Sequence, residues 1–214
     1  MQLTPLHSPN PVDTACAQVA AQLAQQGWCV YPDFLDAKIV NALRLQALQD
    51  WQAGQFRHAG VGRGERFEIK PEIRNDQVKW LEQAHSSDGL ANYFSALETL
   101  RLAINQQSYL GLFDYEAHLA VYPPGSFYKK HLDQFRGIGL RTVTSTFYLN
   151  ENWLPEHGGQ LRLYTDSNDP GHYHDIQPQA GTLVTFLSAD YLHEVLPATR
   201  ERLSITGWFR RRVA

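Results

Sequence analysis

The stretch FDYEAHLAVY, residues 113–122, is where the chain changes from helical to strand periodicity. Apolar side chains occupy alternate positions and would share one face of an extended strand: Phe113, Tyr115, Ala117, Leu119 and Val121. Further strand-like segments follow, separated by turns with Gly and Pro, at 142–149, 161–165, 181–187 and 202–209. This succession of short strands predicts a β-sandwich or jelly roll over residues 113–210.

The first half of the chain has mainly helical patterns. Residues 13–26 and 92–110 carry apolar residues at helical spacing, and Gly27 would end the first of these helices. Asp36 can cap a further helix. The apolar stripe of that helix would consist of Ile39, Leu43 and Ala47.

Two segments of the first half are not helical. Residues 28–35, WCVYPDFL, have the character of a short strand, and residues 57–80 are glycine-rich and charged, which indicates a mobile hairpin or loop. We therefore expect a single α+β domain over residues 1–214. Its double-stranded β-helix (jelly-roll) core would span 113–210, braced by mainly helical support in residues 1–112.

Composition excludes several classes of protein. Hydrophobic residues make up 43% of the 214 residues, charged residues 19%, and the net charge is -3, so nothing favours nucleic acid or an anionic membrane as a partner. The two cysteines, Cys16 and Cys29, disfavour a disulfide scaffold and a thiolate zinc site. We see no signal peptide and no run long enough to span a bilayer, so we expect a cytoplasmic protein.

A possible metal site begins in FYKKHLDQF, residues 127–135, where His131 and Asp133 are two residues apart. Side chains at that spacing point to the same face of a strand, although the pair alone could equally be an ordinary surface pair. A third ligand could come from His172 and His174, but their polar segment GHYHD is typical of an exposed turn. His193 is the better candidate, because it follows the apolar strand GTLVTFLS and would lie near the core.

The strand after His193 has an unusual polar face that starts with Arg202. Ser204, Thr206 and Trp208 would share this face, as would be expected for the wall of a polar pocket. A guanidinium can bind a carboxylate through two parallel hydrogen bonds, and Tyr148 on the strand TVTSTFYL could assist it. Arg200 is the alternative cation for that role. Two histidines and one carboxylate are the facial triad of non-haem Fe(II) oxygenases, and the additional arginine suits 2-oxoglutarate.

Several separated motifs, in order, resemble the Fe(II)/2-oxoglutarate-dependent prolyl 4-hydroxylases, in particular the hypoxia-inducible-factor prolyl hydroxylases and their bacterial relatives. The resemblance covers roughly residues 55–210. It is carried by IRNDQVKW (73–80), YPPGSFYKKHLD (122–133), RTVTSTFYLNENW (141–153), GGQLRLY (158–164) and LHEVLPATRERLSITGW (192–208). One departure is Asn75, where the family usually has glycine, which implies a stiffer loop at that point.

The resemblance implies a role for each matching residue. The iron ligands, which are also the catalytic residues, would be His131, Asp133 and His193. The 2-oxoglutarate site would consist of Arg202, Tyr148, Tyr122, Tyr128, Leu161 and Thr206. Residues that bind the substrate would be Arg141 and Trp208 near the prolyl ring, with Arg74 and Asp76 in the closing loop.

The reaction implied is hydroxylation at C4 of a prolyl residue in a protein, using Fe(II), 2-oxoglutarate and O2, with ascorbate as a reductant and succinate and CO2 as co-products. The substrate would be an exposed prolyl loop, and the bacterial branch implies elongation factor Tu. Because Asp133 occupies the position that a halide would otherwise take, hydroxylation is favoured over halogenation. Two alternatives stay open: a hydroxylase of a free amino acid or other small molecule, and a non-catalytic, metal-binding jelly-roll sensor.

Overall fold

The computed structural model describes residues 10–62, 68–85, 87–134, 140–166, 169 and 171–212. Three α-helices precede most of the strands: α1 (Pro11–Gln26), α2 (Ala37–Gln52) and α3 (Asp88–Ser108). The expected signals delimit them, since Gly27 ends α1 in the left-handed conformation and the Asp36 side chain accepts a hydrogen bond from the Lys38 amide at 2.8 Å. None of the described helices is long and apolar enough to cross a bilayer.

The strands form two antiparallel sheets, which confirms the jelly-roll prediction. The major sheet contains seven strands in the order β1 (Trp28–Tyr31), β9 (Leu183–Leu187), β6 (Arg141–Tyr148), β11 (Arg202–Arg211), β4 (Leu112–Tyr122), β3 (Gln77–Trp80) and β2 (Arg57–His58). The minor sheet contains β5 (Tyr128–His131), β10 (His193–Val195), β7 (Leu161–Tyr164) and β8 (Tyr173–Ile176). Two 3₁₀ turns, Gln83–His85 and Pro155–His157, complete the described elements.

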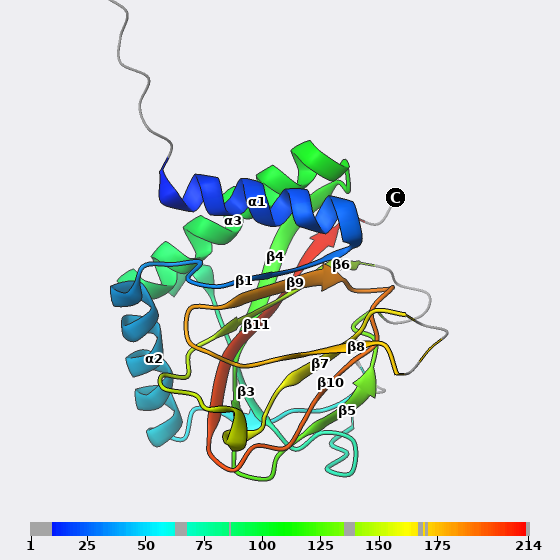
Figure 1. The fold of residues 1–214 in the computed structure, drawn as a ribbon. Coiled ribbons are helices and arrows are strands. Elements are labelled where there is room, and N and C mark those ends of the chain that lie inside the picture. Colours follow the sequence, from blue (N-terminus) through cyan, green and yellow to red (C-terminus); the bar gives the residue numbers. More distant parts are fainter. Residues whose placement is uncertain are drawn as a thin grey trace, which may run out of the picture.

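The major sheet is buried on both faces, and its residues alternate accordingly. One face packs on the helices through an apolar cluster that includes Val143, Phe147, Ile205 and Phe209. The opposite face packs on the minor sheet, as Figure 1 shows with the helices lying away from β5, β7, β8 and β10. The polar residues of β6 and β11 therefore lie between the sheets, as their spacing predicts.

The segment 57–80 matches the hairpin of the two expected alternatives, because its two ends are the antiparallel strands β2 and β3. β3 joins the major sheet beside β4, with Trp80 opposite His118, and β2 continues the sheet beyond it. A bridge between Val61 and Glu68 closes part of the connection, whose residues 63–67 lie outside the described range. β3 consists of the four residues QVKW, and the glycines and charged residues before them give the segment little strand periodicity.

Asn150 fastens the ends of β6 and β11 to the turn before β9. It is 5% exposed, its amide donates to the carbonyls of Pro178 and Leu203, and its carbonyl accepts from the Leu203 amide at 2.7 Å. We expect Asn150→Leu to lower the free energy of unfolding by about 3 kcal/mol, because buried backbone groups lose their partners. Chemical denaturation would measure this, with the exposed Asn92→Leu as a control that should change stability little.

Candidate metal and dicarboxylate site

Three predicted ligands converge at one end of the minor sheet. His131 ends β5, His193 begins β10, and the antiparallel register places these two residues directly opposite each other. Asp133 follows β5, and one ligand atom from each of the three side chains lies within 4.8 Å of the others. The three side chains predicted as ligands therefore lie together, although Asp133 and His193 are 60 residues apart in sequence.

Backbone contacts fix the orientation of both imidazoles. Nδ1 of His131 lies 2.7 Å from the Lys129 carbonyl, and Nδ1 of His193 lies 3.1 Å from the Tyr191 carbonyl. A carbonyl only accepts hydrogen bonds, so each Nδ1 carries a proton, and in a neutral ring the lone pair is then on Nε2. Both Nε2 atoms lie 3.5 Å from an oxygen of Asp133, which leaves their lone pairs directed at a common point.

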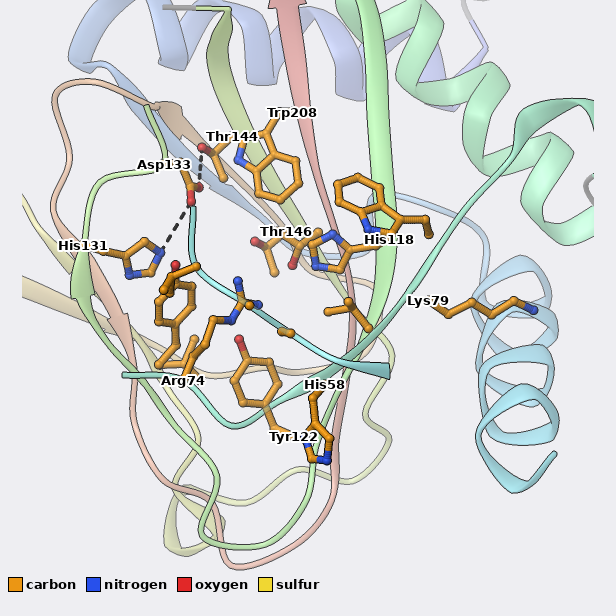
Figure 2. A pocket seen from close by; sticks show the side chains of 18 of the residues that line it. His58, Arg74, Lys79, His118, Tyr122, His131, Asp133, Thr144, Thr146 and Trp208 are labelled. Atoms are coloured by element: carbon orange, nitrogen blue, oxygen red, sulfur yellow. Dashed lines mark hydrogen bonds and ion pairs between the residues drawn. The ribbon is translucent and has the colours of Figure 1, made fainter. Parts of the chain in front are cut away.

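The protonation states suit a divalent cation. Burial raises the pKa of Asp133, but the neighbouring His193 and His131 outweigh burial and hold the pKa well below its usual range. Burial, followed by the charge of His131, lowers the pKa of His193 to about 4. The Thr144 hydroxyl donates to Asp133 at 2.8 Å (Figure 2). It also contacts the Ser188 hydroxyl at 2.9 Å. At neutral pH the cluster therefore offers a carboxylate and a neutral imidazole, which fits Fe(II).

The rival histidines do not form such a cluster. His172 is exposed and its Nδ1 contacts Asp169 at 2.7 Å, while the ring of His174 packs on Trp28 with centroids 4.8 Å apart. Among the described residues, the only group of three or more metal-ligating side chains that could hold an ion contains His193 instead.

A cavity of about 1150 Å³ lies beside the triad. The cross-strand register arranges its floor in successive rows on the inner face of the major sheet. Arg202 is opposite Tyr122, Thr206 is opposite both His118 and Thr146, and the next row on β11 is Trp208. The floor thus runs from Arg202 at one end, past Thr206 and Thr146, to the row of Trp208 and Thr144 at the other.

Arg202 provides a buried positive charge at the inner end of this cavity. It is 2% exposed, and its Nε donates to the Gly159 carbonyl at 2.9 Å. No carboxylate lies within salt-bridge distance of it in the described part of the chain. Its guanidinium carbon is 5.0 Å from the ring centroids of both Tyr122 and Tyr148. An arginine in this position can bind a carboxylate from a ligand.

The phenols around Arg202 are protonated and available as donors. Burial raises the pKa of Tyr148 despite the opposing effect of Arg202, and burial likewise raises the pKa of Tyr122. The Tyr148 hydroxyl is buried and has no hydrogen-bond partner among the residues that the structure describes. Four predicted residues of this site line the cavity with Arg202: Tyr122, Tyr128, Leu161 and Thr206.

At the outer end, Arg141 is held in place by its neighbours. Its guanidinium carbon lies 3.4 Å from the centroid of the Trp208 ring, and its Nε donates to Glu116 at 2.8 Å. Arg210 donates to the other oxygen of Glu116 at 2.8 Å, and two further bonds link Arg210 to Asp114. Glu116 is not among the residues predicted from the sequence, because it lies on the polar face of residues 113–122 and the strand pattern is carried by the apolar face.

The two predicted residues of the closing loop have different positions. Arg74 lines the cavity and lies 4.2 Å above the ring of Tyr128. Asp76 is fully buried and accepts two hydrogen bonds from Arg74, at 2.8 and 2.6 Å, so it holds Arg74 rather than facing the cavity. Between them, Asn75 accepts a hydrogen bond from the Phe127 amide at 2.8 Å. This hydrogen bond needs a side chain at residue 75, so the asparagine that replaces the usual glycine of the family has a structural role.

Comparison with known proteins assigns the family. Residues 117–210 match the family model of the 2OG-Fe(II) oxygenase superfamily. The crystal structure of a Pseudomonas putida prolyl-4-hydroxylase is 45% identical, with a TM-score of 0.83 over 92% of this chain and 100% of that one. The chain belongs to the prolyl hydroxylases of the 2-oxoglutarate/Fe(II) oxygenase superfamily.

Other prolyl hydroxylases support this assignment. One from Trichoplax adhaerens, in complex with a peptide of the hypoxia-inducible factor oxygen degradation domain, is 28% identical with a TM-score of 0.81, covering 93% of this chain and 90% of that one. The hypoxia-inducible factor prolyl hydroxylase of Caenorhabditis elegans is 33% identical over 89% of this chain but only 27% of its own length. Human Egl nine homolog 1 is 30% identical over 86% of this chain and 44% of its own length. The chain thus spans less than half of each of these two curated relatives.

The oxygenases of this superfamily use Fe(II), 2-oxoglutarate and O2, and the site of this prolyl hydroxylase family member fits them. The donor set of two imidazoles and one carboxylate suits iron. The buried Arg202 and the orphaned Tyr148 hydroxyl suit the far carboxylate of 2-oxoglutarate.

We expect Asp133→Ala to weaken Fe(II) binding more than tenfold, because the only anionic ligand is lost. Anaerobic calorimetric titration with Fe(II) would measure this, and circular dichroism would check that the fold is retained. His174→Ala should bind iron like the unmodified chain. The assignment is wrong if His174→Ala loses iron and His193→Ala retains it.

Proposed function

We propose that this chain is an Fe(II)- and 2-oxoglutarate-dependent dioxygenase that hydroxylates C4 of a prolyl residue in a protein substrate. Succinate and CO2 would be the co-products. The observation that carries the proposal is a single cavity that joins a buried His-Asp-His cluster to a buried arginine without an acidic partner among the described residues. Membership of the prolyl hydroxylase family supports the choice of reaction.

In this proposal the protein positions the reactants and excludes water, while iron with 2-oxoglutarate and O2 supplies the oxidising chemistry. His131, Asp133 and His193 hold the metal, and Arg202 with Tyr148 binds the far carboxylate of 2-oxoglutarate. The remaining 2-oxoglutarate pocket consists of Tyr122, Tyr128, Leu161 and Thr206. The substrate contacts are Arg141, Trp208 and Arg74, with Asp76 fixing Arg74.

The size of the cavity favours a polypeptide substrate. Its volume of about 1150 Å³ exceeds the roughly 300–1,000 Å³ common for small-molecule sites. It also extends from the triad to Arg57 and His58 on β2, well beyond the inner end where 2-oxoglutarate would bind. The exposed prolyl loop of bacterial elongation factor Tu is the substrate we propose, on the basis of the resemblance to the bacterial branch.

Two further assignments belong to the proposal. Ascorbate would act as the reductant that returns oxidised iron to Fe(II). The protein would work in the cytoplasm, which is consistent with Cys16 and Cys29 being free thiols. Burial raises the pKa of Cys16 to about 12 and that of Cys29 to about 11, so both are poor nucleophiles.

The alternatives differ from the proposal in what they leave unexplained. A non-catalytic metal sensor has no use for Arg202, which is costly to bury without an anionic partner. A small-molecule hydroxylase would use Arg202 but not the outer cavity with Arg141 over Trp208. Variants of Arg202 and Arg141 distinguish these three functions.

We expect Arg202→Ala to reduce the affinity for 2-oxoglutarate at least tenfold, because two charge-assisted hydrogen bonds of about 1.5–3 kcal/mol each are lost. Anaerobic titration of the Fe(II)-loaded protein with 2-oxoglutarate, followed by its visible charge-transfer band, would measure this. Fe(II) affinity should hardly change. Arg200→Ala is the matched control, since Arg200 is exposed and packs on Trp153. If Arg200→Ala weakens 2-oxoglutarate binding and Arg202→Ala does not, the co-substrate binds elsewhere.

For the substrate, we expect added oxygen on prolyl residues in a bacterial proteome treated with the chain, Fe(II), 2-oxoglutarate and O2, with elongation factor Tu among the products. Peptide mass spectrometry would identify the sites. Arg141→Ala should reduce this hydroxylation more than tenfold yet retain most of the slow 2-oxoglutarate decay seen without substrate.

Arg162→Ala is the matched control for this test, because Arg162 also pairs with a carboxylate, Asp175, and covers a ring, Tyr173, but lies outside the cavity lining. It should hydroxylate normally. Efficient hydroxylation of free L-proline, retained by Arg141→Ala, would instead establish the small-molecule alternative.

A further inference from the structure

His118 occupies a central position on the cavity floor that the assigned roles do not explain. It lies on β4, opposite Thr206 of β11 on one side and Trp80 of β3 on the other. Thr206 belongs to the proposed 2-oxoglutarate pocket, whereas Trp80 is 52% exposed at the rim. His118 therefore stands where the inner part of the cavity meets the part open to a substrate, and Figure 2 shows its ring beside Thr146.

The imidazole of His118 is buried and makes no hydrogen bond to the described part of the chain. The residue is 4% exposed, and its Nδ1 is enclosed without a partner. Two indoles hold the ring, with centroid distances of 5.1 Å to Trp80 and 5.4 Å to Trp208. Nδ1 is closed off from the cavity, whereas Nε2 is not enclosed and has no partner among the described residues. Because buried polar groups are almost always paired in folded proteins, an unpaired Nε2 beside a cavity is available to a ligand.

The chemistry of the ring defines what it could bind. Burial, followed by the charges of Arg74 and Arg141, lowers the pKa of His118 to about 3, so the ring is neutral. Nδ1 has no acceptor beside it, and a buried N–H without an acceptor is rarer than an unpaired acceptor. The proton is therefore placed on Nε2, and His118 offers one neutral N–H donor to the cavity.

A prolyl residue is complementary to such a donor. Proline has no backbone N–H, so its peptide unit presents only a carbonyl acceptor. The two arginines at this end of the cavity already have carboxylate partners, Arg74 with Asp76 and Arg141 with Glu116. His118 is the neutral donor beside them.

We propose that His118 is a specificity-determining residue whose Nε2–H donates a hydrogen bond to a backbone carbonyl of the bound substrate polypeptide at the prolyl residue. This inference rests on the proposed function, and it adds the polar contact by which the chain would recognise the prolyl backbone. The competing explanation is a packing role between the two indoles.

The two explanations predict opposite effects on stability. If His118 serves packing, His118→Leu should lower Tm. If His118 is kept for binding, an apolar side chain removes an unpaired buried polar group, so Tm should stay the same or rise while substrate binding weakens. His118→Gln provides a rescue, because its side-chain amide can place an N–H near the position of Nε2.

The probe is a synthetic, fluorescently labelled peptide that carries the prolyl site found in the proteome experiment above. Its dissociation constant would be measured by anisotropy, without oxygen, on the chain loaded with Fe(II) and 2-oxoglutarate. We expect a tenfold weaker peptide affinity for His118→Leu and a change below threefold for His118→Gln. The 2-oxoglutarate affinity should be unaltered in both, and the exposed His172→Leu should behave as the unmodified chain.

Peptide affinity unchanged in His118→Leu would overturn the inference while leaving the proposed function intact. A lower Tm in His118→Leu together with equally weak binding by His118→Gln would also overturn it, in favour of packing. If the unmodified chain adds oxygen to no prolyl residue, the proposed function fails, and this inference fails with it.

Discussion

The pairing of β5 with β10 is the constraint on which the site depends. It sets His131 opposite His193, with ring centroids 4.2 Å apart. A shift of one residue would turn one of them to the other face of the sheet, because side chains alternate along a strand. Carbonyls of the same chain segments then fix both rings, so the ligand geometry is built largely from backbone. The backbone of the protein thus sets the positions of both histidine ligands.

The major sheet connects this site to the stability of the whole domain. Alternate residues of β11 pack on the helices or line the cavity, so Ile205 and Phe209 belong to the core while Arg202 and Trp208 face the site. The helices of the first half therefore support the cavity by holding the opposite face of its floor. Because the helices hold the apolar face of β11, the opposite face of that strand can carry Arg202, which is 2% exposed.

Much of this arrangement could be predicted from the sequence, and what could not has a physical reason. The polar face beginning at Arg202 is a local pattern, and local period-2 patterns determine side-chain direction along a strand. The residues of the His131–Asp133 pair were predicted correctly, although Asp133 lies in a bend after the end of β5 and not on the strand. Residues 57–80 were expected to form a hairpin or loop, and the four residues of β3 give too little periodicity to predict that this hairpin joins the major sheet beside β4. The buried position of Asp76 and the link from Glu116 to Arg141 depend on which strands become neighbours, and spacing within one segment does not contain that information.

The cavity floor also shows how binding and stability oppose each other in this chain. Several buried polar atoms without partners lie on this inner face: the Tyr148 hydroxyl, the Ser204 hydroxyl, Nδ1 of His118 and the indole nitrogen of Trp208. Apolar residues at these positions would give a more stable sheet, since each unpaired polar atom disfavours folding. Their position in line from Arg202 to the rim indicates that the protein alone leaves this surface incomplete. A ligand that binds at this surface binds only the folded state and stabilises it, so occupancy of the site and stability of the jelly roll are linked.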